Sequence, residues 1–182
     1  MPAAAAFRSL PLLAALLVAS AGADALAQPQ GAASARPSRL GEHGAWTAAT
    51  HTENGQKICY AFARPSRSDP ADRQDVMLTV THRPGQRDAV VLSPGYTYPR
   101  GAEVKVSVGG AALDFYTAGA AAAPRDAAAA LRAFRNGREA VARGPGPNGR
   151  GTATDAFPLA GFGAALDAIN RECPPPTGRQ RR

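Results

Sequence analysis

The sequence predicts a mainly β fold: a single antiparallel, β-sandwich-like domain with one or two short α-helices. Three observations support this. Segments that alternate apolar and polar residues are short, as expected for strands. The two-residue turns Asn54-Gly55 and Gly109-Gly110 each separate two such segments, which is typical of β-hairpins. Helical periodicity is confined to about residues 124–136 and 160–171.

The first expected hairpin joins residues 46–51 to residues 57–63 through Glu53-Asn54-Gly55. A polar loop with two prolines follows at residues 64–70. The remaining expected strands cover residues 76–82, 89–93, 103–108, 112–117, 139–143 and 151–157.

Both expected helices have end signals or an apolar face. The first is expected to begin after Asp126 and to end at Gly137. In the second, Phe162, Leu166 and Ile169 recur at helical spacing, which predicts one apolar face turned to the core.

The N-terminal segment has the pattern of a signal peptide over residues 1–27. Arg8 precedes an apolar stretch at residues 10–19, and Ala25-Leu26-Ala27 matches a cleavage site; a cut after Ala21 is the alternative. This predicts that the chain is exported from the cytoplasm. No other apolar stretch approaches the roughly 20 residues of a membrane-spanning helix. We therefore expect a soluble or peripherally membrane-attached protein.

Composition divides the rest of the chain into a flexible leader at residues 28–43, a β domain at 44–173 and a disordered basic tail at 174–182. The net charge is +7, from 21 Lys and Arg against 14 Asp and Glu. Such a charge suits an anionic partner, or simply maintains solubility. Nucleic acid is not expected, because the chain is exported and its aromatic residues are too sparse for a stacking surface.

Cys59 and Cys173 are the two cysteines of the sequence. In an exported chain they are expected to form a disulfide with each other. The alternative, a catalytic thiol, has little support, because no histidine is near Cys59 in sequence. No Cys-x-x-Cys pair or zinc-ligand spacing is present, so we expect neither a metal nor a cofactor.

Catalytic motifs are also missing from the sequence. His43, His51 and His82 could each supply a general base, and Ser93 or Thr117 a nucleophile. No motif is present that would position them for catalysis, so we expect no catalytic residues.

The acidic residues of the central segment do not form a carboxylate pair. Asp72, Asp75 and Asp88 are scattered among Arg73 and Arg87, which predicts solvated ion pairs of small energetic value.

Tyr96, Tyr98 and Arg150 form the candidate interaction surface. Tyr96 and Tyr98 share one face by the period of two, and they form either an exposed binding patch or part of the core. The core interpretation is favoured for the tyrosines, because the chain has few other large residues to bury.

An ordered series of short motifs spans residues 44–173. Its members are Trp46, Lys57-Ile58-Cys59-Tyr60, Leu78-Thr79-Val80-Thr81-His82-Arg83-Pro84, Gly95-Tyr96-Thr97-Tyr98, Val108-Gly109-Gly110, Asp114-Phe115-Tyr116-Thr117, Arg150-Gly151-Thr152-Ala153-Thr154-Asp155 and Leu159-Ala160-Gly161-Phe162-Gly163-Ala164-Ala165-Leu166. In this order the motifs resemble the invasion-associated locus B family of exported bacterial proteins. The resemblance implies a protein of the periplasm or outer cell envelope of a Gram-negative bacterium, linked in pathogenic relatives to host-cell invasion, with no catalytic residues to carry over.

We therefore expect a non-enzymatic envelope protein that interacts with an envelope or host-surface component; its oligomeric state stays open. Two alternatives remain. A small periplasmic hydrolase would need a pocket joining His82 or His51 to a Ser or Asp. A basic binder of anionic lipid or polysaccharide would need a contiguous arginine face.

Overall fold

Within residues 36–175, which a computed structural model describes, eleven strands form one antiparallel sheet. The expected signal peptide, residues 28–35 of the expected leader and residues 176–182 of the expected tail lie outside the described residues. The strands, in chain order, are β1 (Ser38–His43), β2 (Trp46–Glu53), β3 (Gln56–Ala63), β4 (Arg67–Asp69), β5 (Met77–Arg83), β6 (Gln86–Ser93), β7 (Glu103–Val108), β8 (Ala111–Ala118), β9 (Ala121–Pro124), β10 (Glu139–Pro145) and β11 (Thr152–Pro158).

Their order across the sheet is β1-β2-β3-β5-β6-β9-β8-β7-β10-β11-β4. Two helices accompany the sheet, α1 (Ala127–Asn136) and α2 (Phe162–Glu172). The prediction of a mainly antiparallel β domain with two short helices is therefore confirmed. Of the residues that the structure describes, no helix is long and apolar enough to cross a membrane.

Local sequence signals account for several of these elements. Asn54 and Gly55 form the β2–β3 turn with φ angles of 50° and 76°, the left-handed values that a two-residue hairpin requires. The carboxylate of Asp126 accepts a hydrogen bond at 2.9 Å from the backbone N–H of Ala129 and so caps α1. The hairpin and the start of the first helix were both predicted correctly.

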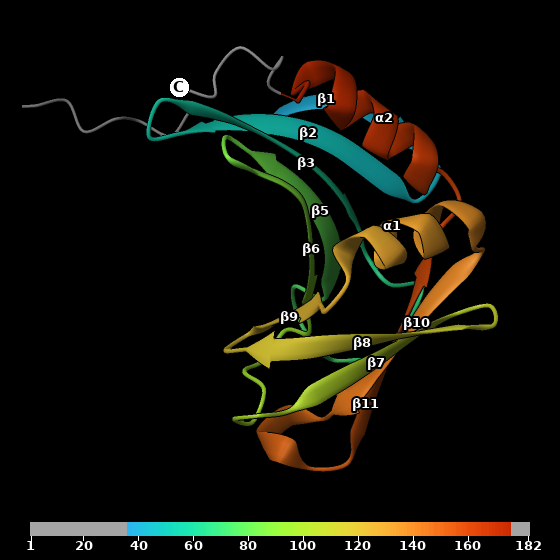
Figure 1. Ribbon diagram of the computed structural model, residues 1–182. Helices are drawn as coiled ribbons and strands as arrows, with labels where there is room; N and C mark the ends of the chain where they lie inside the picture. Colours follow the sequence, from blue (N-terminus) through green and yellow to red (C-terminus); the bar gives the residue numbers. More distant parts are fainter. Residues whose placement is uncertain (1–35, 176–182) are drawn as a thin grey trace, which may run out of the picture. The chain divides into compact units, whose positions relative to one another are not determined.

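The sheet bends sharply between β6 and β9, as Figure 1 shows. These two strands share a single register pair, Leu92 with Ala122, so few ladder hydrogen bonds hold the sheet flat there. The bend makes the single sheet sandwich-like, because the buried faces of its two halves contribute to one hydrophobic cluster.

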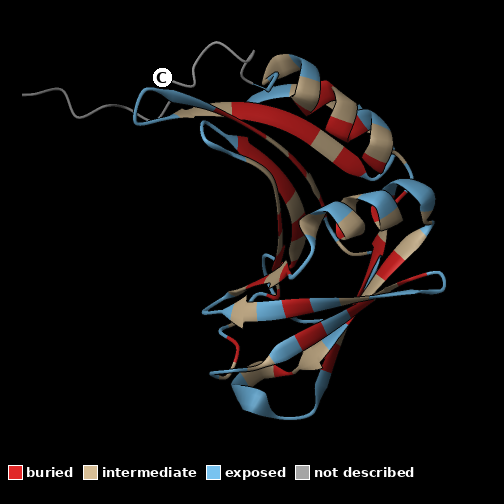
Figure 2. Ribbon diagram, viewed as in Figure 1, coloured by how far each residue is buried: buried red, intermediate tan, exposed pale blue. Residues whose placement is uncertain are grey.

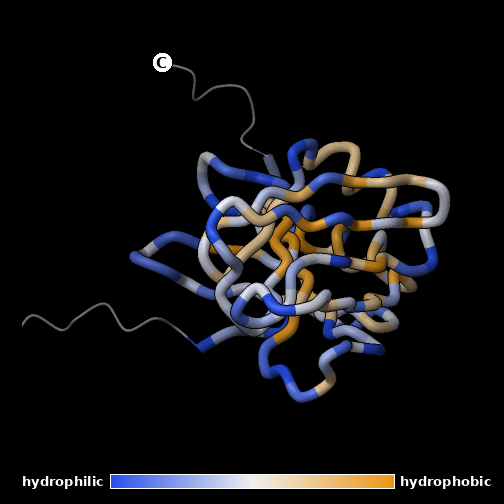
Figure 3. The backbone as a smooth tube through the Cα atoms, turned by 90° about the horizontal axis from the view of Figure 1, so that it is seen from below, coloured by the Kyte–Doolittle hydropathy of each residue, from blue (hydrophilic) through white to orange (hydrophobic). Residues whose placement is uncertain are grey.

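The core lies on the face of the sheet that the two helices cover (Figure 1). Trp46 and Phe162 of α2 pack edge to face with ring centroids 4.9 Å apart, and Phe134 of α1 meets Phe162 at 5.6 Å. All three side chains are fully buried. Buried residues follow the strand centres and the inner side of α2 (Figure 2), and hydrophobic segments gather in the interior (Figure 3).

Three strands were missed. β1 occupies part of the expected leader, and its Gly- and Arg-containing sequence becomes a strand because it pairs with β2 over Ser38–His43. The leader prediction is therefore wrong for residues 38–43. β4 is a three-residue edge strand within the expected loop at residues 64–70, and β9 (Ala121–Pro124) contains only alanine and proline. Neither segment carries the β-branched or aromatic residues by which strands are found in sequence.

The junction between β1 and α2 requires a glycine. Gly161 has φ +91°, and a Cβ there would overlap the carbonyl oxygen of His43. The backbone N–H of Ala45 donates to the carbonyl of Ala160 at 3.3 Å beside it. This close approach fixes where α2 begins over the sheet.

Candidate functional site

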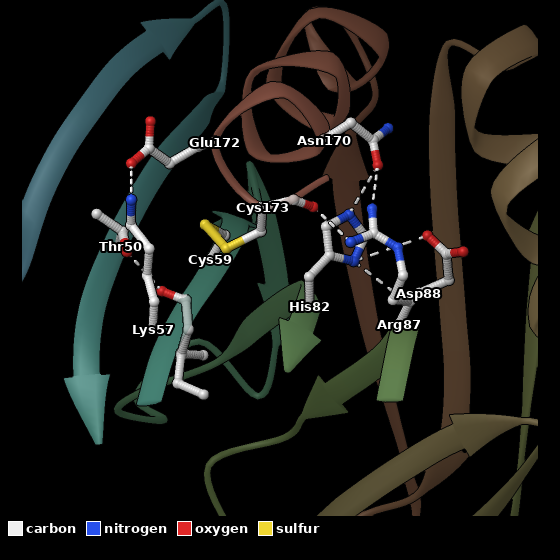
Figure 4. Close-up of a disulfide and its surroundings, with 10 residues drawn as sticks. Thr50, Lys57, Cys59, His82, Arg87, Asp88, Asn170, Glu172 and Cys173 are labelled. Carbon is white, nitrogen blue, oxygen red and sulfur yellow. Dashed lines mark hydrogen bonds and ion pairs between the residues drawn. A yellow bond between two sulfur atoms is a disulfide. The ribbon is translucent and has the colours of Figure 1, made fainter. Parts of the chain in front are cut away.

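The disulfide between Cys59 and Cys173 ties the end of α2 to β3, the third strand from one edge of the sheet (Figure 4). Cys59 lies in β3 and is fully buried, and Cys173 is the residue that ends α2. Their Cα atoms are 6.1 Å apart, within the usual range for a disulfide. The predicted pairing of the two cysteines is confirmed.

Arg87 of β6 binds the same end of α2. Its Nη2 donates to the side-chain oxygen of Asn170 at 2.7 Å, and its Nη1 donates to the carbonyl oxygen of Cys173. A cation at this position is favourable, because the last carbonyls of a helix carry partial negative charge. Because a guanidinium only donates hydrogen bonds, the Asn170 atom that faces it must be the oxygen.

The buried His82 of β5 is held at both ring nitrogens. Its Nε2 lies 3.0 Å from the side-chain oxygen of Asn170, so Nε2 carries the proton. Its Nδ1 accepts the backbone N–H of Asp88 at 3.1 Å. The neutral ring therefore has no free lone pair with which to act as a general base.

Burial, and next the positive charge of Arg87, lower the pKa of His82 below its ordinary value of 6.5. As the pH falls through about 6.5, the unfolded chain gains a proton at residue 82 that the folded protein does not bind. Stability contributed by His82 is thus complete above pH about 6.5 and is lost as the pH falls toward the lowered folded-state pKa.

We expect His82→Gln to weaken the loss of stability on acidification. The measurement is the free energy of unfolding in urea at pH 8 and at pH 5 for wild type, His82→Gln and the control His51→Gln. His82→Gln should lose less stability between the two pH values than wild type and His51→Gln do. Equal losses in all three proteins would show that His82 does not cause the acid sensitivity.

Two cavities adjoin this group of residues, and Arg87 lines both. The first has a volume of about 640 Å³ and is lined by Lys57, His82, Arg83, Pro84, Gly85, Arg87, Glu172, Cys173 and Pro174. The second has a volume of about 630 Å³ and is lined by Arg87, Asp88, Leu131, Arg132, Arg135, Leu166, Asn170 and Pro175. We call the two together the Arg87 cleft. Its walls come from β3, the β5–β6 hairpin, α1 and the end of α2.

None of the other candidate catalytic residues, His43, His51, Ser93 and Thr117, lines either cavity. His51 lies in β2 and packs edge to face on Tyr60, with ring centroids 5.4 Å apart. Its register partner in β3 is Ile58, the residue before Cys59. Since Cys59 pairs with His82, His51 is on the opposite face of the sheet. The Thr117 hydroxyl donates to the carbonyl of Ala102 at 2.7 Å. Within residues 36–175, no group of His, Cys, Asp or Glu is arranged to hold a metal ion.

Tyr96 and Tyr98 pack together, with ring centroids 5.3 Å apart. Tyr98 is only 7% exposed, and the Tyr96 hydroxyl donates to the carbonyl oxygen of Pro145 at 2.5 Å. Burial raises the pKa of both tyrosines. Arg150 is exposed just before β11, in the turn that follows β10. That Tyr96, Tyr98 and Arg150 form an interaction surface stays a prediction.

Arg73 forms a buried ion pair instead of the solvated pairs expected from the sequence. Its guanidinium meets both carboxylate oxygens of Asp155, at 2.5 and 3.1 Å, and both side chains are 5% exposed. The guanidinium also lies 5.6 Å from the centre of the Tyr96 ring. The expectation was wrong because Asp155 comes from β11, far along the sequence from Arg73.

These features define a class: small, mainly β domains in which a disulfide fixes a C-terminal helix on one antiparallel sheet. Residues 46–170 match the family model described as "Invasion associated locus B (IalB) protein". The chain belongs to this family, as the sequence resemblance predicted.

A solved structure supports the fold. It is titled "Crystal structure of invasion associated protein b from bartonella henselae" and has 18% sequence identity and a TM-score of 0.50. The match covers 72% of this chain and 95% of that chain. At this identity the similarity extends to the fold alone. A search of curated protein sequences gave no match.

Proposed function

We propose that this protein is exported to the periplasm or outer envelope, where it acts as a non-enzymatic interaction protein. The observation that carries the proposal is the disulfide between Cys59 and Cys173. Structural disulfides persist in oxidising compartments and are rare in the cytosol. The signal-peptide pattern at residues 1–27 supports the same destination.

The state of His82 supports a role without catalysis. A hydrolase built on this histidine would need a free ring nitrogen facing a nucleophile or water. Both ring nitrogens of His82 are hydrogen-bonded within the protein, one to Asn170 and one to the backbone of Asp88. The partner that we propose is an envelope or host-surface component.

Fractionation of cells that produce the chain with a C-terminal tag tests the proposal. We expect the protein in the periplasmic or envelope fraction, with a mass that shows removal of residues 1–27. Neither cysteine should react with a thiol reagent until the protein is reduced. Cytoplasmic protein with an intact N-terminus, or two reactive thiols before reduction, would contradict export.

Crosslinking in the intact envelope tests the interaction role. The tagged mature protein should crosslink to a reproducible component, which mass spectrometry identifies after capture. The control for non-specific capture is the variant Cys59→Ala/Cys173→Ala, which is purified, unfolded by heating and then crosslinked to the same envelope preparation. Recovery of the same components with native and unfolded protein would contradict a specific interaction.

A further inference from the structure

We propose that the Arg87 cleft binds an anionic glycan, a sugar chain that carries phosphate or carboxylate groups. This inference rests on the proposed function, because an exported protein is the one that meets such chains in the envelope. It also names the chemistry of the partner.

The walls of the cleft are rich in cations. The first cavity is lined by Lys57, Arg83 and Arg87, with Glu172 as its carboxylate. The second is lined by Arg87, Arg132 and Arg135, with Asp88 as its carboxylate. Five cations thus face two carboxylates, and such a concave surface concentrates anions by its electrostatic field.

Two of these guanidinium groups are available to a ligand. In the described part of the chain, neither Arg87 nor Arg132 forms an ion pair with a carboxylate. Arg87 uses its Nη atoms on Asn170 and Cys173, and a guanidinium has five N–H groups, so further donors remain. Its planar fork suits phosphate and carboxylate oxygens.

The other three cations are paired only with groups near the surface. Arg83 lies 3.6 Å from Glu53, with both side chains almost half exposed. Arg135 lies 2.7 Å from Asp167, and Lys57 pairs with Glu172. Exposed pairs of this kind contribute little stability, so an anionic ligand can displace them at small cost.

Apolar groups line the cleft between the cations. Pro84 and Pro174 contribute to the first cavity, and Leu131, Leu166 and Pro175 to the second. The C–H face of a sugar ring can pack on these groups while its charged substituents reach the guanidinium groups. Cavities of about 640 and 630 Å³ are in the usual range for small-ligand sites.

The sequence that follows the described residues is also positively charged. Pro175 lines the second cavity, and the chain continues beyond it with Arg179, Arg181 and Arg182. These arginines make the C-terminal segment of the chain itself a poor occupant, because like charges repel. They favour a polyanion instead.

A membrane surface fits the cleft less well. Surface binding to a bilayer needs exposed apolar side chains that enter the headgroup region. Of the described residues, Tyr116 is the one large hydrophobic residue that is exposed, at 46%, and it belongs to β8, outside the linings of both cavities. A glycan therefore fits the cleft better than a bilayer does, and vesicle binding is an outcome of the test.

Titration calorimetry with three probes tests the proposal. They are the phosphate-bearing core oligosaccharide released from lipopolysaccharide by deacylation, a neutral dextran oligosaccharide, and vesicles of phosphatidylethanolamine with phosphatidylglycerol. The cleft variant is Arg83→Gln/Arg132→Gln, which leaves Arg87 and its contacts with α2 intact. The control variant is Arg100→Gln/Arg143→Gln, which removes the same charge from exposed residues outside the cleft.

Wild type should bind the phosphorylated oligosaccharide, with an affinity that falls as salt is added, and should not bind dextran. The cleft variant should bind roughly a hundredfold more weakly, about tenfold for each lost charge-assisted hydrogen bond. The control variant should bind nearly as tightly as wild type. Urea unfolding of both variants verifies that each is folded.

Three outcomes would overturn the inference: no binding of the phosphorylated oligosaccharide by wild type, equal weakening in both variants, or binding to vesicles alone. Its failure can be told apart from failure of the proposed function. An exported, oxidised protein that crosslinks to an envelope component but does not bind the oligosaccharide would overturn the cleft inference only. A protein that stays in the cytoplasm would overturn the proposed function.

Discussion

Replacement of both cysteines, Cys59→Ala/Cys173→Ala, is expected to lower the free energy of unfolding by about 4–5 kcal/mol. The disulfide closes a loop between residues 114 positions apart, so its removal releases much conformational entropy in the unfolded chain. Alanine is the appropriate replacement, because Cys59 is fully buried and a serine would place an unpaired hydroxyl in the core. Urea unfolding of the oxidised wild type and of the variant measures the difference.

Reduction of the wild type provides the matched control. The reduced protein should unfold at nearly the same urea concentration as Cys59→Ala/Cys173→Ala, and the reductant should leave the variant unchanged. A difference below about 1 kcal/mol between oxidised wild type and the variant would contradict the expected role. It would mean that packing alone holds α2 on the sheet.

The disulfide is one of three contacts between the same end of α2 and the sheet. Arg87 binds the carbonyl of Cys173 and the side chain of Asn170, and Lys57 pairs with Glu172. Each of these contacts has at least one residue in the lining of the Arg87 cleft. Loss of the disulfide therefore has a consequence for binding as well as for stability, since Cys173 and Pro174 line the first cavity.

Local signals made much of the fold predictable. Asn54-Gly55 fixes a hairpin through the backbone of two residues, and Asp126 caps α1 through a residue three positions away. Such interactions are complete within a short segment. β9, in contrast, is a strand because its neighbours β6 and β8 supply ladder partners, and nothing in the sequence Ala-Ala-Ala-Pro indicates them.

The candidate site was less predictable, because its residues meet only in the folded chain. The disulfide could be predicted, because two cysteines allow a single intramolecular pairing. Arg87 and Arg132 come from β6 and α1, and they line one cavity because α1 packs beside β6. In the sequence, both arginines are indistinguishable from those that keep the surface soluble.

The ion pair of Arg73 with Asp155 leads to the second large expected effect. Asp155→Ala should lower the free energy of unfolding by about 3–5 kcal/mol, because it leaves the Arg73 charge buried without a counter-ion. The remaining partners of Arg73 are neutral carbonyl oxygens, those of Pro70 at 3.0 Å and Pro94 at 2.8 Å among them. Urea unfolding near neutral pH measures the loss.

Two further variants separate the buried charge from ordinary contact loss. Asp114→Ala removes the partner of Lys105 from a pair with both side chains more than half exposed, so it should change stability far less. Arg73→Met/Asp155→Leu removes both charges and should recover part of the stability that Asp155→Ala loses, since apolar replacements avoid the desolvation of an unpaired ion. If the double variant is less stable than Asp155→Ala, the hydrogen bonds from Arg73 to the backbone carbonyls matter more than its charge. The main role of Arg73 would then be to hold the segment before β5 in place through its hydrogen bonds to backbone carbonyls.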